Sequence, residues 1–194
     1  MTVLALFGEG KGKTTSAIGQ AVRALGHDSN SIIIAQFNKN DDSIGEFKFF
    51  FKKHPMINCE IIHFGAGCTH PTLRKQQRCM ECGECGRNVR LNRTKVEWAI
   101  QKIIKKEPKY GVIILDEILI SLSYGYITTK EIEDLVATAP EKTWILTGRL
   151  FSVNTNVHVP NRLWMIEFAD YVTEMVQHKH PYNRGVTARK GVEY

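Results

Sequence analysis

The chain has 194 residues, enough for one α/β domain with a sizeable core, and its fractions of hydrophobic and charged residues are ordinary for a globular protein. No apolar run approaches the roughly 20 residues of a membrane span, and the N-terminus begins with a strand pattern rather than a signal peptide, so we expect a cytoplasmic protein without a membrane partner. The net charge of +6 suits a polyphosphate ligand as well as nucleic acid, and alone it leaves nucleic-acid binding a minor alternative.

The first fifteen residues carry a phosphate-binding motif. The apolar run Thr2–Phe7 predicts a strand, the stretch Gly8–Thr15 reads Gly-Glu-Gly-Lys-Gly-Lys-Thr-Thr, and a helical pattern covers Ser16–Leu25. In a strand, glycine-rich turn and helix of this kind, backbone N–H groups and the helix dipole face an anion. We expect Lys13 to reach a phosphate oxygen and the Thr14 hydroxyl to bind Mg²⁺. The loop is one residue shorter than the standard Gly-x-x-x-x-Gly-Lys-Thr spacing, and a bare glycine turn is the weak alternative.

The rest of the chain alternates strand and helix patterns. Short apolar runs predict strands at Ser31–Phe37, Cys59–His63, Gly111–Leu115, Trp144–Leu146 and Tyr171–Met175. Helical patterns cover Glu46–Lys53, Arg93–Lys106 with Asn92 as N-cap, a segment from Thr128 or Thr129 to Ala137, and Asn161–Phe168. This alternation predicts an α/β three-layer sandwich with a mostly parallel sheet, a RecA-like P-loop nucleoside triphosphate-binding fold. We expect one domain over residues 1–194, with a cysteine-rich loop insertion at 65–88.

Polar residues follow the ends of most predicted strands. They are Gly8–Thr15, Gln36–Lys39, Asp116 and Glu117, Thr147–Arg149, and Glu174. Because ligands of parallel sheets bind beyond the carboxyl ends of the strands, this pattern predicts a nucleotide site there. Asp116 and Glu117 look like a Walker B pair that holds Mg²⁺ opposite Thr14, with a solvated acidic pair as the alternative. Arg149 is a candidate donor to a phosphate or ribose, and a surface salt bridge is nearly as good an interpretation.

The cysteines are bunched in one loop. Their odd count in a chain that we expect to be cytosolic argues for metal binding over disulfides. Cys68, Cys79, Cys82 and Cys85 suit a [4Fe–4S] cluster, which we favour weakly, or a zinc ion. Structural cysteines without a metal are the third alternative. His70 is a spare ligand candidate, although a lone loop histidine is more often solvated.

Taken together, these motifs resemble the P-loop ATP:corrinoid adenosyltransferases, which act on cob(I)alamin or cob(I)yrinic acid a,c-diamide. The matching residues are Gly8–Thr15, Arg23-Ala-Leu-Gly26, Gln36-Phe37 with Lys39, Leu115-Asp-Glu117, Tyr124-Gly125, Thr147-Gly-Arg149, Ala169-Asp170, Val172-Thr-Glu-Met175, Lys179-His-Pro181, Gly185, Ala188, Gly191 and Glu193. The shortened phosphate loop is itself a trait of that family, so it adds to the resemblance.

The resemblance implies that the 5′-deoxyadenosyl group of ATP passes to the cobalt of a reduced corrinoid while triphosphate leaves. It implies catalytic roles for Lys13, Asp116, Glu117 and Arg149 and a Mg²⁺ held by Thr14 and Asp116. The expected ligand-binding residues are Gly8, Glu9, Gly10, Lys11, Gly12, Lys13, Thr14, Thr15, Gln36, Lys39, Thr147, Arg149, Glu174, Lys179 and His180. The expected partners are ATP, a corrinoid and an electron-donating reductase, and the expected assembly is a homodimer.

Two departures from the family pattern stand out. Where the family has Gly-x-Gly-Phe-Thr-Trp, whose aromatics help to strip axial ligands from cobalt, this chain has Gly65-Ala-Gly-Cys-Thr-His70. The family homodimer also has an N-terminal helical extension that covers the partner's site, and because this sequence opens on the first strand pattern we expect no such extension here. We hypothesise that a redox cluster in the cysteine loop delivers the electron that makes Co(I), and its rival is a metal staple that only orders the loop.

Two other functions compete with the adenosyltransferase. One is a RecA-like ATPase that acts on nucleic acid and uses the cysteine loop as a metal knuckle, and the other is a small-molecule kinase. The shortened loop and the lack of an aromatic stacking stripe disfavour the ATPase.

Overall fold

The structure is a computed structural model of the whole chain, and it describes residues 1–27, 31–37, 44–53, 58–65, 88–106, 110–151 and 160–192. The strands are β1 (Thr2–Phe7), β2 (Ile32–Gln36), β3 (Cys59–His63), β4 (Val112–Asp116), β5 (Thr143–Gly148) and β6 (Tyr171–Glu174). The helices are α1 (Lys13–Leu25), α2 (Gly45–Phe47), α6 (Val89–Lys106), α7 (Ile118–Ser123), α8 (Thr129–Ala137) and α9 (Pro160–Phe168). A π-helical turn, Lys48–Lys53, continues α2, and a 3₁₀ turn covers Pro181–Arg184.

The described strands form one six-stranded sheet in the order β3-β2-β4-β5-β1-β6, and every pair is parallel. The last residues of neighbouring strands are in register, because Phe7 pairs with both Gly148 and Glu174. Gln36 likewise pairs with Asp116. The carboxyl ends of β1, β2, β4, β5 and β6 therefore meet at one edge of the sheet.

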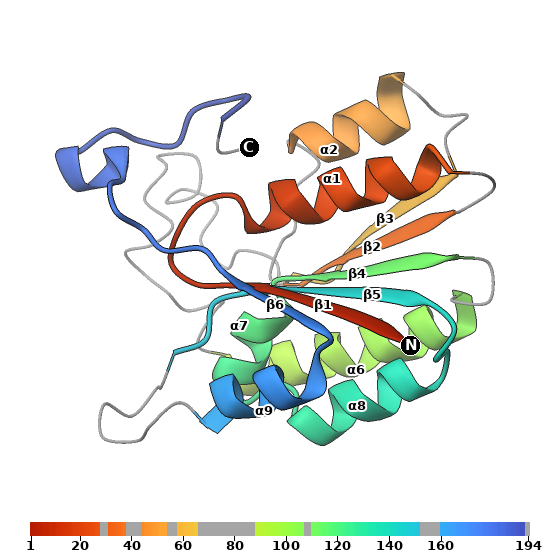
Figure 1. Cartoon of the computed structure of the whole chain (residues 1–194). Coiled ribbons are helices and arrows are strands. Elements are labelled where there is room, and N and C mark those ends of the chain that lie inside the picture. The colour runs from red at the N-terminus through yellow and green to blue at the C-terminus, as the bar shows by residue number, and fades with distance from the viewer. Residues whose placement is uncertain are drawn as a thin grey trace.

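Helices cover both faces of the sheet. In Figure 1, α1 and α2 lie on one face and α6, α7, α8 and α9 lie on the other. Successive residues of a strand point to opposite faces, so Ile33 and Leu115 pack toward the four-helix side. Ile34 and Ile114 pack with Ala17 and Ala21 of α1. The predicted α/β sandwich with a parallel sheet is thus confirmed, and within the described residues no helix is both long and apolar enough to cross a membrane.

Several helix boundaries differ from the prediction. α1 begins at Lys13 rather than Ser16, because the glycine loop ends at Gly12 with φ 115°. α6 begins at Val89, so Asn92 lies inside the helix with 5 % exposure and the prediction that it is the N-cap was wrong. The cap lies four residues earlier, where the Asn88 side-chain oxygen accepts a hydrogen bond from the Leu91 N–H.

The start of α8 agrees with the prediction. Thr128 and Glu131 form a capping box, in which the Thr128 hydroxyl accepts from the Glu131 N–H and the Glu131 carboxylate accepts from the Thr128 N–H. Glu131 also accepts hydrogen bonds from Arg93 of α6. This pair ties the start of α8 to the first half of α6.

The sequence did not predict α7. Ile118, Leu119, Ser121, Leu122 and Ser123 are all buried, so the helix has no polar face and shows no amphipathic period. The predicted helix at Glu46–Lys53 is a three-residue α-helix followed by the π-helical turn. Most of the predicted cysteine-rich loop, with Cys68, His70, Cys79, Cys82 and Cys85, lies outside the described residues, and so does Lys39.

Candidate nucleotide site

The glycine loop packs against the chain that leaves β6. The Gly10 N–H donates a 2.6 Å hydrogen bond to the Met175 carbonyl oxygen. A Cβ on Gly10 would lie 2.7 Å from that oxygen, and one on Gly8, whose φ is 107°, would lie 2.6 Å from it. Only glycine allows two backbone segments to approach so closely. The contact also occupies the Gly10 N–H, which in this conformation does not face the anion cradle.

Lys13 is the first residue of α1 and lies under the loop. Its Nζ donates a 2.6 Å hydrogen bond to the Gly10 carbonyl oxygen, and the side chain is largely buried. Burial lowers the pKa of Lys13, and the positive charge of Arg149 lowers it further, while Glu117, Glu9 and Asp116 act in the opposite direction. The ammonium group thus already lies inside the loop, where an anion would replace the Gly10 carbonyl as its partner.

Asp116 is buried at the end of β4 and receives donors from three elements. The Thr14 hydroxyl donates to Asp116 Oδ1 at 2.8 Å, and the Thr147 hydroxyl donates to the same oxygen at 2.7 Å. The amide of Gln36 donates to Oδ2 at 3.3 Å. Gln36, Asp116 and Thr147 all have 0 % exposure. Thr14 and Asp116, which the sequence predicts as ligands of one Mg²⁺, are therefore in direct hydrogen-bond contact, and their role as metal ligands stays a prediction.

This cluster has the donor chemistry of a magnesium site. Mg²⁺ prefers carboxylate, hydroxyl and water oxygens, and the Thr14 and Asp116 oxygens lie side by side at the edge of the sheet. Gln36 Oε1 is buried and has no hydrogen-bond partner among the described residues. A buried acceptor beside the carboxylate suits a donor such as a metal-bound water. The residues present therefore fit the ion.

Glu117 has a left-handed backbone, with φ 68°. This conformation is uncommon for a residue other than glycine and is often found at functional sites. The Glu117 N–H donates to the Thr147 hydroxyl at 3.0 Å, and α7 begins at the next residue. The turn brings Glu117 to the wall of the cleft.

A cleft of about 770 Å³ lies beyond the carboxyl ends of the strands. Among the predicted site residues, those that line it are Glu9, Gly10, Lys11, Gly12, Lys13, Thr14, Thr15, Glu117, Arg149 and His180. Arg149 reaches across the opening to Glu9, with 3.1 Å between nitrogen and oxygen, and both side chains are at least half exposed. The cleft is large enough for a nucleotide.

Other predicted residues lie near the cleft but do not line it. Gln36 and Thr147 donate hydrogen bonds to Asp116, and Asp116 also accepts one from Thr14, which lines the cleft. The side chain of Glu174 pairs with Arg162 at 2.7 Å on the exposed side of the loop. Lys179 is exposed and is not among the lining residues.

Sequence reasoning missed several residues that line the cleft. They are Ile18 of α1, Ile44, Gly45 and Glu46 near α2, and Val192 of the tail, with Gly191 noted only through the resemblance. The tail lines the cleft at His180, whose Nδ1 accepts from the Tyr182 N–H at the start of the 3₁₀ turn, and again at Gly191 and Val192 after that turn. None of these residues has a local sequence signal, because their proximity to the loop arises only on folding.

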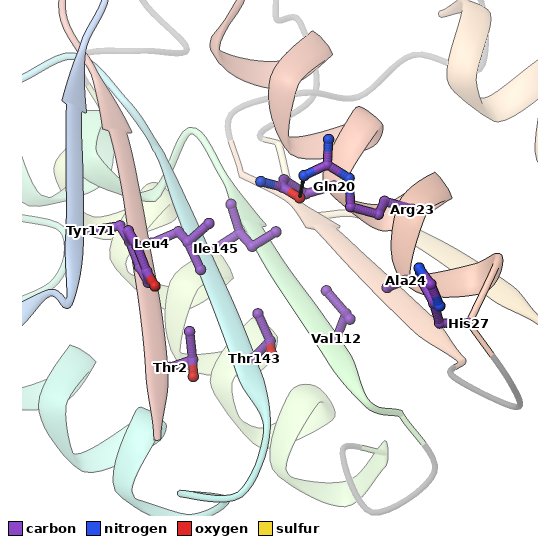
Figure 2. Close-up of a pocket in the computed structure, with 10 residues that line it drawn as sticks. All are labelled: Thr2, Leu4, Gln20, Arg23, Ala24, His27, Val112, Thr143, Ile145 and Tyr171. Carbon is purple, nitrogen blue, oxygen red and sulfur yellow. Dashed lines mark hydrogen bonds between the residues drawn. The ribbon is translucent and has the colours of Figure 1, made fainter.

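A second pocket, of about 490 Å³, lies between α1 and strands β1, β4, β5 and β6 of the sheet (Figure 2). Arg23 and Gln20 of α1, joined by a 3.3 Å hydrogen bond, face Leu4, Ile145 and Tyr171 of the strands. Thr143 and Val112 on its floor are the first residues of β5 and β4. This pocket therefore lies toward the amino ends of the strands and shares no lining residue with the cleft. The predicted polar residues converge on the cleft alone, which makes the cleft the candidate site.

Among the described residues, no group of three or more His, Cys, Asp or Glu side chains is arranged to hold a metal ion by itself. The predicted Fe–S or zinc ligands lie outside the described residues and stay a prediction.

Curated relatives match almost the whole chain. A corrinoid adenosyltransferase of Pseudomonas aeruginosa is 31% identical over 188 residues, which cover 96% of this chain and 80% of that protein. One from Sinorhizobium sp. is 32% identical over 189 residues, with 96% and 77% covered. The corrinoid adenosyltransferase CobA of Salmonella typhimurium is 28% identical over 193 residues, with 99% and 85% covered. The family model for ATP:corrinoid adenosyltransferase BtuR/CobO/CobP matches residues 1–194, and the chain therefore belongs to this family of transferases.

Proposed function

We propose that this protein transfers the 5′-deoxyadenosyl group of ATP to the cobalt of a reduced corrinoid and releases triphosphate. Membership of the family supports the substrates. The observation that carries the proposal is the 2.8 Å contact between Thr14 and Asp116, next to Lys13 and at the floor of a cleft beyond the strand ends. This is the arrangement that a magnesium nucleotide requires.

The reaction needs little acid–base chemistry from the protein. The electron pair of Co(I) attacks C5′ of the ribose and forms the cobalt–carbon bond. The bond between C5′ and its oxygen breaks, and its electrons leave with the triphosphate. No proton is removed, so no residue has to act as a base. Catalysis then depends on holding cobalt in line with C5′ and on stabilising the leaving group.

Lys13 and Arg149 are the cations suited to the triphosphate. Both lie on the cleft, where Lys13 donates to the Gly10 carbonyl oxygen and Arg149 pairs with Glu9. Phosphate oxygens are stronger hydrogen-bond acceptors than a carbonyl and offer more charge than one carboxylate. We propose that both side chains exchange these partners for the triphosphate.

Thr14 and Asp116 would hold the Mg²⁺ ion, and Glu117 faces the same cleft. When bound, the ion neutralises part of the negative charge of the triphosphate. The resemblance to the family implies that the triphosphate lies in the loop in reverse, so that C5′ and not the γ-phosphate faces the attacking atom. The loop that is one residue short is consistent with this binding mode, which we extend to this chain.

The remaining functional predictions belong to the same proposal. They are a homodimer, an electron-donating reductase, a cytoplasmic location, and an iron–sulfur cluster or zinc ion on Cys68, Cys79, Cys82 and Cys85. Anaerobic purification followed by visible spectroscopy tests the cluster. A cysteine-free variant with full activity on a Co(II) corrinoid would remove its redox role.

The decisive experiment supplies ATP and chemically reduced cobalamin without oxygen. We expect the Co(I) absorbance to give way to that of a light-sensitive alkylcobalamin, with one triphosphate released for each cobalt alkylated. Lys13→Ala serves as the inactive control. Release of ADP and phosphate, stimulated by DNA or RNA, would instead indicate the ATPase, which the family match does not favour.

A further inference from the structure

We propose that Thr147 is a positioning residue whose hydroxyl sets the orientation of the magnesium carboxylate, Asp116. The inference rests on the proposed function in one respect only, namely that Asp116 and Thr14 bind a magnesium nucleotide. Thr147 is fully buried at the end of β5 and does not line the cleft. Its effect on the ligand must therefore pass through its neighbours.

The Thr147 hydroxyl makes two hydrogen bonds whose directions are determined by their partners. The Glu117 N–H can only donate, so the hydroxyl oxygen accepts that bond at 3.0 Å. The single proton of the hydroxyl is then left for Asp116 Oδ1, 2.7 Å away. The amide hydrogen takes a lone pair of the hydroxyl while Asp116 Oδ1 takes its proton, so the two bonds favour the same orientation of the hydroxyl. In this arrangement Asp116 Oδ1 faces a donor.

The surrounding backbone holds the hydroxyl in place. Glu117, the residue after β4, has a left-handed φ of 68°, and its N–H donates to the Thr147 hydroxyl. On the other side, Gly148 has φ 142°, and a Cβ there would lie 3.0 Å from the Ile120 nitrogen of α7. The chain therefore approaches α7 closely right after Thr147. Two unusual backbone conformations, at Glu117 after β4 and at Gly148 of β5, thus lie next to this side chain and its hydrogen-bond partner.

The consequence for the metal follows from the geometry of Asp116. Thr14 donates to the same oxygen, but an arriving ion would also bind a lone pair of the Thr14 hydroxyl, so this side chain has to serve the ion as well as Asp116. Thr147 lies beneath the cleft, away from the ligand, and keeps its bond when Thr14 is recruited. Groups that orient a metal ligand in this way commonly change metal affinity when they are removed.

The test measures the magnesium-dependent gain in ATP affinity, defined as the Kd for ATP in EDTA divided by the Kd in saturating Mg²⁺. Isothermal titration of the full chain gives both values without any corrinoid or turnover. For Thr147→Val, which removes the hydroxyl at nearly constant volume, we expect the gain to fall by about tenfold or more. Affinity in EDTA should stay close to wild type. Thr147→Ser keeps the hydroxyl and should preserve the gain.

Thr143→Val is the matched control, because Thr143 lies on the same strand but lines the second pocket (Figure 2). It should leave the gain unchanged. If Thr147→Val does not fold, Thr147→Cys replaces it, since a thiol is only a weak donor. A full magnesium gain in the variant without the hydroxyl would overturn the proposal. So would a loss in Thr147→Ser equal to that in Thr147→Val, or a wild-type protein with no magnesium gain.

The outcomes also separate this inference from the proposed function. A wild-type protein that binds ATP with a magnesium gain but forms no alkylcorrinoid would refute the adenosyl transfer. The role of Thr147 would then still be decided by the titration, because no step of the test depends on cobalt.

Discussion

The close contact between the glycine loop and the exit of β6 leads to a sharp prediction. In Gly10→Ala, the new methyl group would lie 2.7 Å from the Met175 oxygen, 2.8 Å from the Met175 carbonyl carbon and 2.9 Å from the Val176 carbonyl carbon. All three are backbone atoms, so the crowding cannot be relieved by a side chain that swings away. Either the loop or the strand exit must move, and the hydrogen bond from the Gly10 N–H to Met175 would be lost with it.

The expected cost follows from these contacts. Overpacking by a methyl group destabilises proteins by about 1–3 kcal/mol, and a lost hydrogen bond adds about 1 kcal/mol. We therefore expect Gly10→Ala to lower the free energy of unfolding by about 3 kcal/mol. In a domain of this size, 1 kcal/mol corresponds to about 2–4 °C, so Tm should fall by about 6–12 °C.

Thermal denaturation followed by circular dichroism checks this value, with Gly19→Ala as the matched control. Gly19 is in the interior of α1, and a Cβ there meets no atom within 4 Å. Alanine is a better helix former than glycine, so this change should stabilise by about 0.5–1 kcal/mol. A Gly10→Ala protein whose Tm stays within about 1 °C of wild type would refute the close approach of the two segments.

Other residues of the site and of the helix layer give further predictions. Lys13→Ala should lower the rate of triphosphate release by about 10²–10³-fold, because a donor to the developing anion is lost, while its circular dichroism spectrum stays native. A variant that keeps its activity would exclude Lys13 as the phosphate ligand. Glu9→Gln frees Arg149 from its ion pair, so the Kd for ATP measured by calorimetry should fall, and a higher Kd would show that Glu9 contributes to binding instead. Hydrogen bonds from Arg93 lower the pKa of Glu131 to about 2, so the stability from this pair is present above the unfolded-state value near 4.5 and is lost as pH falls toward 2. Between pH 6 and pH 3, the free energy of unfolding measured by urea denaturation should fall by about 1–2 kcal/mol more in wild type than in Glu131→Gln. This figure allows for solvent screening of a pair that is about one-third exposed. Parallel pH profiles of the two proteins would contradict the prediction.

The sequence determined the local elements because their signals are local. The glycine loop between an apolar run and a helix, the buried strand before Asp116, and the Thr128 cap each depend on residues a few positions apart. Each is present in the structure. The α/β class followed from the alternation of such elements along the chain. Even the errors, such as Asn92 in place of Asn88, concern a helix that does exist.

Only the tertiary structure decided which of these residues meet. β5 lies between β1 and β4, which brings Thr147 to Asp116 and Thr14 from separate parts of the chain. The contact of Gly10 with Met175 depends on the parallel pairing of β6 with β1. Thr147 and Asp116 are 31 positions apart and Thr14 and Asp116 are 102 apart, and no periodicity in a single sequence records such contacts. The sequence therefore determined the type of site, whereas strand order determined which side chains orient its carboxylate.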